Sequence, residues 1–185
     1  MDTIESLKNH FLIATPELKG SLFENAVIYL FAHDPDGAMG VMINKPHSIS
    51  WPEICSQLGL QTSGTRTPDV FVGGPVSVNH GYLLYQSETA FDQSMTITTD
   101  LHISTSSDQL KAIASGDHPD HMGLYLGYSG WSPAQLDQEI LDNAWLTLPG
   151  DTNLLFNTPP DQVYQRALET LGIDINFFSH DAGHA

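Results

Sequence analysis

The chain has 185 residues, 41% of them hydrophobic, which is long enough to bury one sizeable core. Its 22 acidic and 6 basic residues give a net charge of -16, and the six cations are scattered singly. Because nucleic-acid backbones are bound chiefly through clustered Lys and Arg, we do not expect direct nucleic-acid binding. No apolar run approaches the roughly 20 residues of a membrane-spanning helix, so we expect no membrane association either.

The single cysteine, Cys55, rules out an internal disulfide. The N-terminal residues lack the basic start and the long apolar core of a signal peptide. Both features lead us to expect a cytoplasmic protein. We expect one domain over residues 1–185, with residues 1–9 as a candidate flexible arm and residues 179–185 as a candidate flexible tail.

The first half of the chain is dominated by strand patterns. An apolar run at residues 11–14 ends at Pro16 and predicts a strand. Residues 25–31 and 38–43 flank the turn sequence Asp34-Pro35-Asp36-Gly37, which predicts an antiparallel hairpin. A capping-box pattern at residues 50–53 predicts a helix through about Leu58.

The middle of the chain alternates short elements with loops. Residues 61–68 are polar and predict a surface loop, and residues 70–72 predict a strand that runs into a constrained turn at residues 73–76. Residues 81–85 predict a further strand, and residues 88–104 one or two short strands. Residues 106–115 predict a helix that Gly116 ends.

Residues 122–146 predict a strand, a tight turn and a helix. The apolar run at residues 124–126 ends at Gly127 and predicts the strand. Ser132 can cap a helix whose first residue is Pro133, with Gln135 as the reciprocal partner of the cap. The spacing of Leu136, Ile140 and Ala144 predicts the buried stripe, and that of Gln135, Glu139 and Asn143 a polar stripe beside it.

The C-terminal part predicts a short buried strand at residues 154–156 and a helix that starts after Thr158 and continues through Leu171. A hairpin comes first, and strands and helices alternate later. This order predicts an α+β (mixed α/β) single domain with a mainly antiparallel sheet or open barrel and flanking helices.

The glycine turns and the histidine groups carry no complete motif. Residues 127–130 match neither a dinucleotide fingerprint nor a P-loop, so a structural turn is the favoured interpretation. Two groups contain imidazole and carboxylate side chains that suit zinc, but solvated histidines are favoured for both, and we predict no metal and no cofactor. The groups are Asp117, His118, Asp120 and His121, and His180, Asp181 and His184.

Glu139 is the best single candidate for acid–base chemistry, because its helix follows the glycine turn. His33, Asn44, His80 or Ser129 could converge on it, although no spacing requires this. We therefore predict no catalytic set. The alternative interpretation of Glu139 and Asn143 is a side chain that bonds to the neighbouring loop, and Cys55 is interpreted as an inert packing residue.

Several of these segments together resemble the AlgH family (YqgE-like) of small bacterial proteins. The resemblance covers nearly the whole chain, including HFLIATP at residues 10–16 and LGYSGW at residues 126–131. The other matching segments are residues 33–46, 73–76, 135–136, 139–140, 143–146 and 182–185. Four positions depart from the usual family pattern: His80 stands in place of Arg, Tyr85 in place of His, Ala134 in place of Gly, and Asp137 in place of Glu.

The resemblance implies a bacterial cytosolic protein with an α+β fold and no particular enzymatic activity. The family name refers to a proposed regulatory role in alginate production and transcription, which in this acidic chain would be indirect. We expect a non-enzymatic protein that binds a protein partner or a small ligand. The alternative is an enzyme with a polar pocket near Glu139, Asn143 and a histidine. The candidate binding pocket comprises Asn44, Gly73, Gly74, Gly130, Trp131, Gln135, Glu139 and Asn143.

Overall fold

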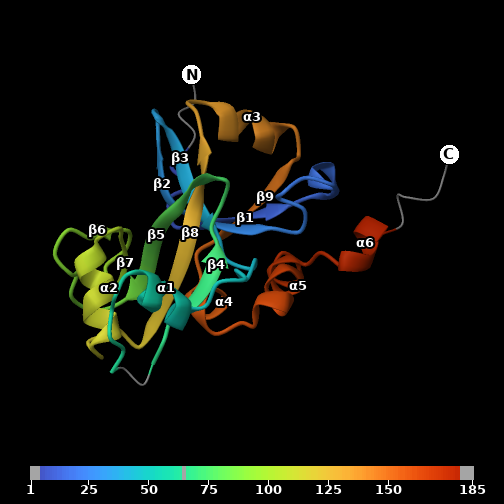
Figure 1. Cartoon of the computed structure of the whole chain (residues 1–185). Coiled ribbons are helices and arrows are strands. Elements are labelled where there is room, and N and C mark those ends of the chain that lie inside the picture. The colour runs from blue at the N-terminus through green and yellow to red at the C-terminus, as the bar shows by residue number, and fades with distance from the viewer. Residues whose placement is uncertain (1–4, 64–65, 180–185) are drawn as a thin grey trace. The chain divides into compact units, whose positions relative to one another are not determined.

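The computed structural model describes residues 5–63 and 66–179. The chain divides into two compact units. We call Met1–Asn44 with Gly130–Ala185 the terminal unit, and Lys45–Ser129 the inserted unit. The strands are mainly antiparallel and are accompanied by helices (Figure 1), which confirms the predicted mixed α/β fold class. The single-domain boundaries 1–185 stay a prediction.

The terminal unit contains four antiparallel strands in the order β9-β1-β2-β3. In this register Leu12 of β1 lies opposite Ile28 of β2 and Thr147 of β9. The predicted first strand and hairpin are confirmed. The elements of this unit are β1 (His10–Ala14), η1 (Pro16–Leu18), β2 (Val27–Asp34), β3 (Gly37–Met42), α3 (Gln135–Leu141), β9 (Trp145–Pro149), α4 (Thr152–Phe156), α5 (Pro160–Thr170) and α6 (Ile175–Ser179).

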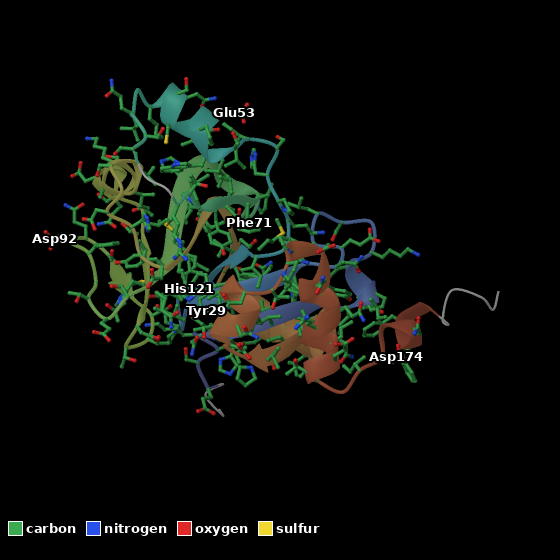
Figure 2. All side chains as sticks on the ribbon, turned by 90° about the horizontal axis from the view of Figure 1, so that it is seen from below. Tyr29, Glu53, Phe71, Asp92, His121 and Asp174 are labelled. Atoms are coloured by element: carbon green, nitrogen blue, oxygen red, sulfur yellow. The ribbon has the colours of Figure 1, made fainter. Side chains whose placement is uncertain are left out.

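Local chemistry explains the hairpin turn between β2 and β3. The Asp34 carboxylate accepts the backbone N–H of Asp36 at 2.8 Å, and Gly37 has a φ of 137°. The core of the unit lies where α5 packs against β1 and β2 through Val163, Ala167 and Leu168. Tyr29 of β2, which Figure 2 labels, is fully buried and donates its hydroxyl hydrogen to Asn9 Oδ1 at 2.8 Å.

The inserted unit contains the antiparallel order β6-β7-β5-β8, and β4 pairs with β8 in parallel. Its core gathers Trp51, Cys55, Tyr85 and Leu124, among others. The capping box of α1 is confirmed, because Glu53 accepts the Ser50 N–H at 2.7 Å (Figure 2 labels Glu53). The elements are α1 (Trp51–Gln57), β4 (Asp69–Val72), β5 (Val76–Gln86), β6 (Met95–Thr96), β7 (Leu101–Ser104), α2 (Ser107–Ala114) and β8 (His121–Trp131), the last of which ends in residues of the terminal unit.

The predicted turn at residues 127–130 is wrong, because β8 continues through it to Trp131. Gly127 has a φ of 75°, and the pairing of β5 with β8 shifts register between Val76 and Gly81. A local irregularity of this kind lets a strand pass through a glycine that would otherwise end it. The glycine at position 127 is thus a strand residue and not the start of an anion-binding turn.

The predicted helix after this strand is too long at both ends. It begins at Gln135 instead of Pro133 and ends at Leu141, and Trp145 and Leu146 belong to strand β9. Ala144 therefore lies outside α3 and does not continue the predicted buried stripe of Leu136 and Ile140. The reason is that residues on both sides of α3 adopt left-handed backbone angles, which residue spacing does not reveal.

The predicted strand at residues 154–156 is also wrong, because these residues lie in helix α4. Asp151 caps this helix by accepting the N–H groups of Asn153 and Leu154 at 2.7 and 3.2 Å. A three-residue apolar run fits a strand or one helical turn equally well, and the cap decides between them. The helix predicted after Thr158 is confirmed as α5.

The glycine pair that precedes β5 lies directly against the backbone of β8. Gly73 donates its N–H to the Leu126 carbonyl at 2.9 Å, and a Cβ at Gly74 would overlap the backbone carbon and oxygen of Tyr128. A close backbone approach therefore explains both glycines. By contrast, a Cβ at Gly81 would only come within 3.2 Å of a Leu124 methyl group, which can move.

We therefore expect Gly74→Ala to lower the free energy of unfolding by about 3 kcal/mol or more, since rigid overlap in a packed interior is costly. Gly81→Ala is the matched control and should cost clearly less. Urea unfolding monitored by tryptophan fluorescence measures both. Equal losses in the two variants would contradict the assigned close approach.

Candidate functional site

The structure brings together three of the predicted pocket residues, Trp131, Gln135 and Glu139, in the terminal unit. Glu139 Oε2 accepts the indole N–H of Trp131 at 2.9 Å and that of Trp145 at 2.8 Å. Its other oxygen, Oε1, accepts the side-chain amide of Gln135 at 2.9 Å. We call these four residues the Glu139 network. It joins the end of β8, helix α3 and the start of β9.

The indole rings of the Glu139 network are buried, with 7% of Trp131 and 2% of Trp145 exposed. The rings meet edge to face, with centroids 6.0 Å apart. A hydrogen bond to a charged acceptor is worth about 1.5–3 kcal/mol, so the carboxylate holds both rings and the helix firmly. Oε2 accepts two hydrogen bonds and Oε1 accepts one, so most of the acceptor capacity of Glu139 serves the network and not a substrate.

Helix α3 is short because the chain turns sharply on both sides of it. Ala134, its N-terminal cap, has a φ of 61°, and Asn143, just after its end, has a φ of 59°. Ser132 keeps half of the predicted capping arrangement, since its N–H donates to Gln135 Oε1 at 3.0 Å. The turns orient α3 so that Gln135 and Glu139 lie one helical turn apart beside the two indoles.

The other predicted pocket residues have separate local roles. Asn44 accepts the Val27 N–H at 2.9 Å and donates to the Asn25 carbonyl at 2.8 Å, which fixes the start of β2. The carbonyl of Asn143 accepts the Thr15 hydroxyl at 2.6 Å. Gly130 is an exposed residue of β8. Gly73 and Gly74 belong to the inserted unit, where they contact the β8 backbone.

A pocket of about 190 Å³ lies beside α3 in the terminal unit, and we call it the His33 pocket. The residues that line it come from the end of β2 and the turn that follows it, from the segment before α3, and from α3 itself. They include His33, Asp34, Pro35, Pro133, Leu136 and Asp137. The spacing of the sequence did not predict this pocket, although His33 was considered as a partner of Glu139.

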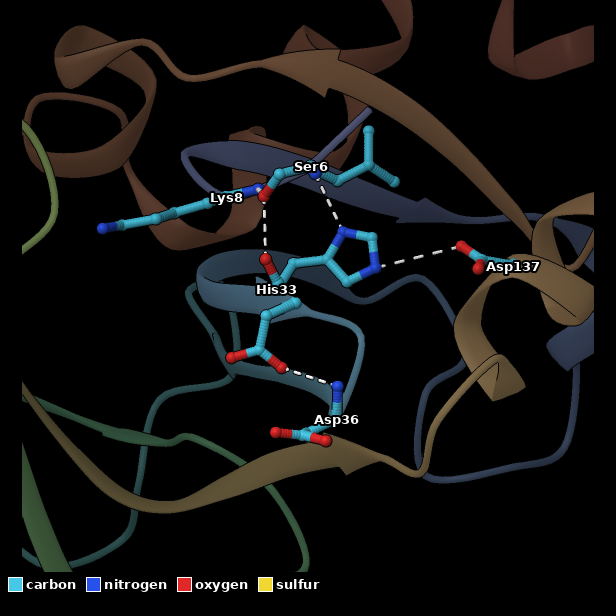
Figure 3. A network of polar contacts seen from close by, with 7 residues as sticks. Ser6, Lys8, His33, Asp36 and Asp137 are labelled. Carbon is cyan, nitrogen blue, oxygen red and sulfur yellow. Dashed lines mark hydrogen bonds and ion pairs between the residues drawn. The ribbon is translucent and has the colours of Figure 1, made fainter. Parts of the chain in front are cut away.

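The ring of His33 is held by the N-terminal segment (Figure 3). Its Nδ1 accepts the backbone N–H of Leu7 at 2.8 Å, and its carbonyl accepts the Ser6 hydroxyl at 2.8 Å. These bonds order part of the predicted arm at residues 1–9, of which residues 1–4 lie outside the described chain. Residues 180–185 of the predicted tail also lie outside it. Because Nδ1 uses its lone pair for Leu7, the neutral ring carries its hydrogen on Nε2.

Asp137 faces His33 without reaching it. Its Oδ1 lies 3.9 Å from His33 Nε2, beyond hydrogen-bond distance, and this buried atom has no hydrogen-bond partner. The Asp137 side chain as a whole is 26% exposed, whereas that of His33 is 10% exposed. The pocket thus combines one directed N–H donor with a carboxylate acceptor. The residue pattern did not predict Asp137 as part of a site, and the resemblance marked it only as a departure from an expected Glu.

The remaining candidates for chemistry do not form a second site in the described chain. His80 is an exposed residue of β5, and Ser129 is buried and donates to the Gly73 carbonyl at 3.2 Å. Cys55 packs in the core of the inserted unit as predicted, and burial raises the pKa of its thiol.

Neither of the two groups weighed as metal ligands adds a metal site in the described chain. Within residues 5–63 and 66–179, no three His, Cys, Asp or Glu side chains are grouped so as to hold a metal ion. His180, Asp181 and His184 lie outside the described residues.

Ala134 gives a test of the backbone geometry beside the pocket. A non-glycine residue in the left-handed region is strained by roughly 1–2 kcal/mol. Glycine removes this strain, but its larger conformational entropy in the unfolded state cancels part of the gain. We expect Ala134→Gly to raise the free energy of unfolding by up to about 1 kcal/mol. The same change at Ala112, inside helix α2, should lower it by about 1 kcal/mol. Denaturant unfolding compares the two, and a loss of stability in Ala134→Gly would contradict the left-handed cap.

The Glu139 network predicts an unusually large effect for an isosteric change. Glu139→Gln removes the charge and turns one acceptor into a donor that faces the Gln135 amide, so we expect a loss of about 1.5–3 kcal/mol in the free energy of unfolding. Glu17→Gln, at an exposed residue of η1, is the control and should stay within about 0.5 kcal/mol of the parent chain. Similar values for both variants would show that the network contributes no stability.

No helix among the described residues combines the length and the apolar character needed to cross a membrane.

Comparison with known proteins is consistent with this fold along the whole chain. A protein of Pseudoalteromonas translucida, named UPF0301, is 37% identical over 98% of this chain and 100% of its own length. One of Chromobacterium violaceum is 41% identical over 97% of this chain and 98% of its own. The solution structure of the AlgH protein from Pseudomonas aeruginosa has a TM-score of 0.81 at 37% identity, over 100% of this chain and 99% of that one.

A structure from Corynebacterium diphtheriae shares the fold at 18% identity, with a TM-score of 0.75 over 97% of this chain and 94% of that one. The family model described as AlgH-like matches residues 11–176. Together these matches confirm the resemblance stated from the sequence. The chain therefore belongs to the AlgH-like family.

Proposed function

We propose that this chain acts by binding, without catalysing a reaction, and that the His33 pocket receives a small polar group of a ligand or of a protein partner. The proposal rests on one observation: the acceptor atoms of the two best acid–base candidates, Glu139 and His33, are already engaged in hydrogen bonds within the fold. Both oxygens of Glu139 accept hydrogen bonds, and His33 Nδ1 accepts the Leu7 N–H. A general base needs a free lone pair within reach of its substrate, and these bonds occupy His33 Nδ1 and three of the roughly four lone-pair positions of Glu139.

The chemistry of the pocket supports a group that both accepts and donates a hydrogen bond. His33 offers Nε2–H as a donor, and the exposed part of the Asp137 carboxylate offers an acceptor. A hydroxyl or a carboxamide satisfies both. An anionic group would meet Asp34 and Asp137 in the pocket lining, so it is disfavoured.

The volume of about 190 Å³ is below the range of roughly 300–1,000 Å³ that is usual for drug-sized ligands. It suits a small molecule or a single side chain of a partner. A regulatory role would follow if the occupied pocket changed the affinity for a second protein, and the net charge of -16 favours an indirect effect on transcription over direct DNA binding.

The test is native mass spectrometry of untagged protein taken gently from its own cells. We expect a bound small molecule or a stoichiometric partner on the parent chain, and its loss from Asp137→Glu, because the longer acid reaches towards His33 and fills the gap of 3.9 Å. Asp120→Glu is the control, at a carboxylate of the inserted unit that bonds Arg66.

Two results would count against the proposal. Equal occupancy in the parent chain and in Asp137→Glu would remove the His33 pocket as the site. Conversion of the released molecule into another compound by excess protein would favour the enzyme alternative, with a polar pocket near Glu139, Asn143 and a histidine.

A further inference from the structure

A second cavity of the terminal unit, of about 260 Å³, lies between the segment that follows β1 and the C-terminal helices. Its apolar lining comes from Pro16 of η1, Tyr164 of α5, and Ile175 and Phe178 of α6. Two charged residues, Lys19 and Glu24, also line it. The lining of the cavity therefore combines apolar side chains with charges of both signs, and a mainly apolar lining with a few polar groups is usual for a small-ligand site.

The side of this cavity that Thr15 and Tyr164 form is held by hydrogen bonds. The Tyr164 hydroxyl donates to the Ala14 carbonyl at 2.7 Å, which ties α5 to the end of β1. Burial raises the pKa of the Tyr164 phenol, so the hydroxyl keeps its hydrogen at neutral pH. Thr15 is fixed as well, through its hydroxyl bond to the Asn143 carbonyl at 2.6 Å. A rigid wall lowers the entropy cost of binding.

The ammonium group of Lys19 has no hydrogen-bond or ion-pair partner among the residues that the structure describes. Other cations of the chain are engaged: Arg66 pairs with Asp120 at 3.3 Å, and Lys111 with Asp108 at 3.3 Å. Glu24 is oriented by the Gly20 N–H, which donates to its Oε2 at 2.9 Å, and a carboxylate can accept further hydrogen bonds. Lys19 and Glu24 are thus two residues of opposite charge that line the same cavity.

We propose that this cavity binds a free apolar α-amino acid such as leucine. The ligand carboxylate pairs with Lys19, its ammonium group with Glu24, and its side chain contacts Ile175 and Phe178. A simple carboxylate would be repelled by Glu24, and a simple amine by Lys19. A peptide terminus carries only one of the two charges, whereas a free amino acid carries both.

The site is separate from the His33 pocket, so either proposal can fail without the other. The experiment titrates L-leucine into the isotope-labelled full chain and follows backbone amide shifts by NMR. We expect saturable shifts around Thr15, Tyr164 and Ile175. Glycine, 4-methylpentanoate and 3-methylbutylamine lack the side chain, the ammonium group and the carboxylate in turn, and each should bind at least roughly tenfold more weakly.

Substitution of Lys19 tests the proposed contact with the ligand carboxylate. Lys19→Gln should weaken leucine binding at least roughly tenfold and leave the free energy of unfolding unchanged, because the Lys19 side chain is exposed and forms no hydrogen bond or ion pair with the described residues. Lys111→Gln, in the inserted unit, is the matched control and should bind as the parent chain does. The proposal is overturned by the absence of saturable shifts, by equal binding of 4-methylpentanoate, or by unchanged affinity in Lys19→Gln.

Discussion

One carboxylate, that of Glu139, determines the geometry of the corner of the terminal unit that contains α3. Its Oε2 accepts two indole hydrogens and its Oε1 an amide hydrogen, so a single charge connects β8, α3 and β9. The surrounding rings limit access of water, and a half-buried carboxylate without these donors would be costly. The fold therefore uses the charge of Glu139 to hold two tryptophans, and that use competes with any use of the same oxygens in catalysis.

The His33 pocket depends on this corner. Helix α3 carries Glu139 towards the tryptophans and Asp137 towards His33, and its start is set by the left-handed backbone of Ala134. Ala134 and Asp137, the two departures near α3 from the pattern that the sequence resemblance implies, both line this pocket. The buried Oδ1 of Asp137 has no hydrogen-bond partner among the described residues, so the pocket contains an acceptor beside His33 that no other group satisfies.

Local patterns predicted most of the elements, because turns and caps depend on residues close in sequence. The hairpin around Gly37 and the capping box at Ser50 are examples. The errors at Gly127 and at residues 154–156 arose where one glycine or a short apolar run fits two conformations. The site was only partly predictable. The polar spacing on α3 indicated Gln135 and Glu139, but the two indole donors and the contact of Leu7 with His33 join segments far apart in sequence.

The net charge of -16 constrains what both cavities can hold. An anion approaching this surface is repelled over about 10 Å at moderate ionic strength, so a ligand with zero net charge reaches either cavity more easily. The His33 pocket suits such a ligand with an N–H donor and a carboxylate acceptor, and the second cavity with the opposite charges of Lys19 and Glu24. In an acidic chain with six basic residues, a lysine that forms no pair within the described structure is more useful for recognition than for stability, because an exposed pair contributes little to folding.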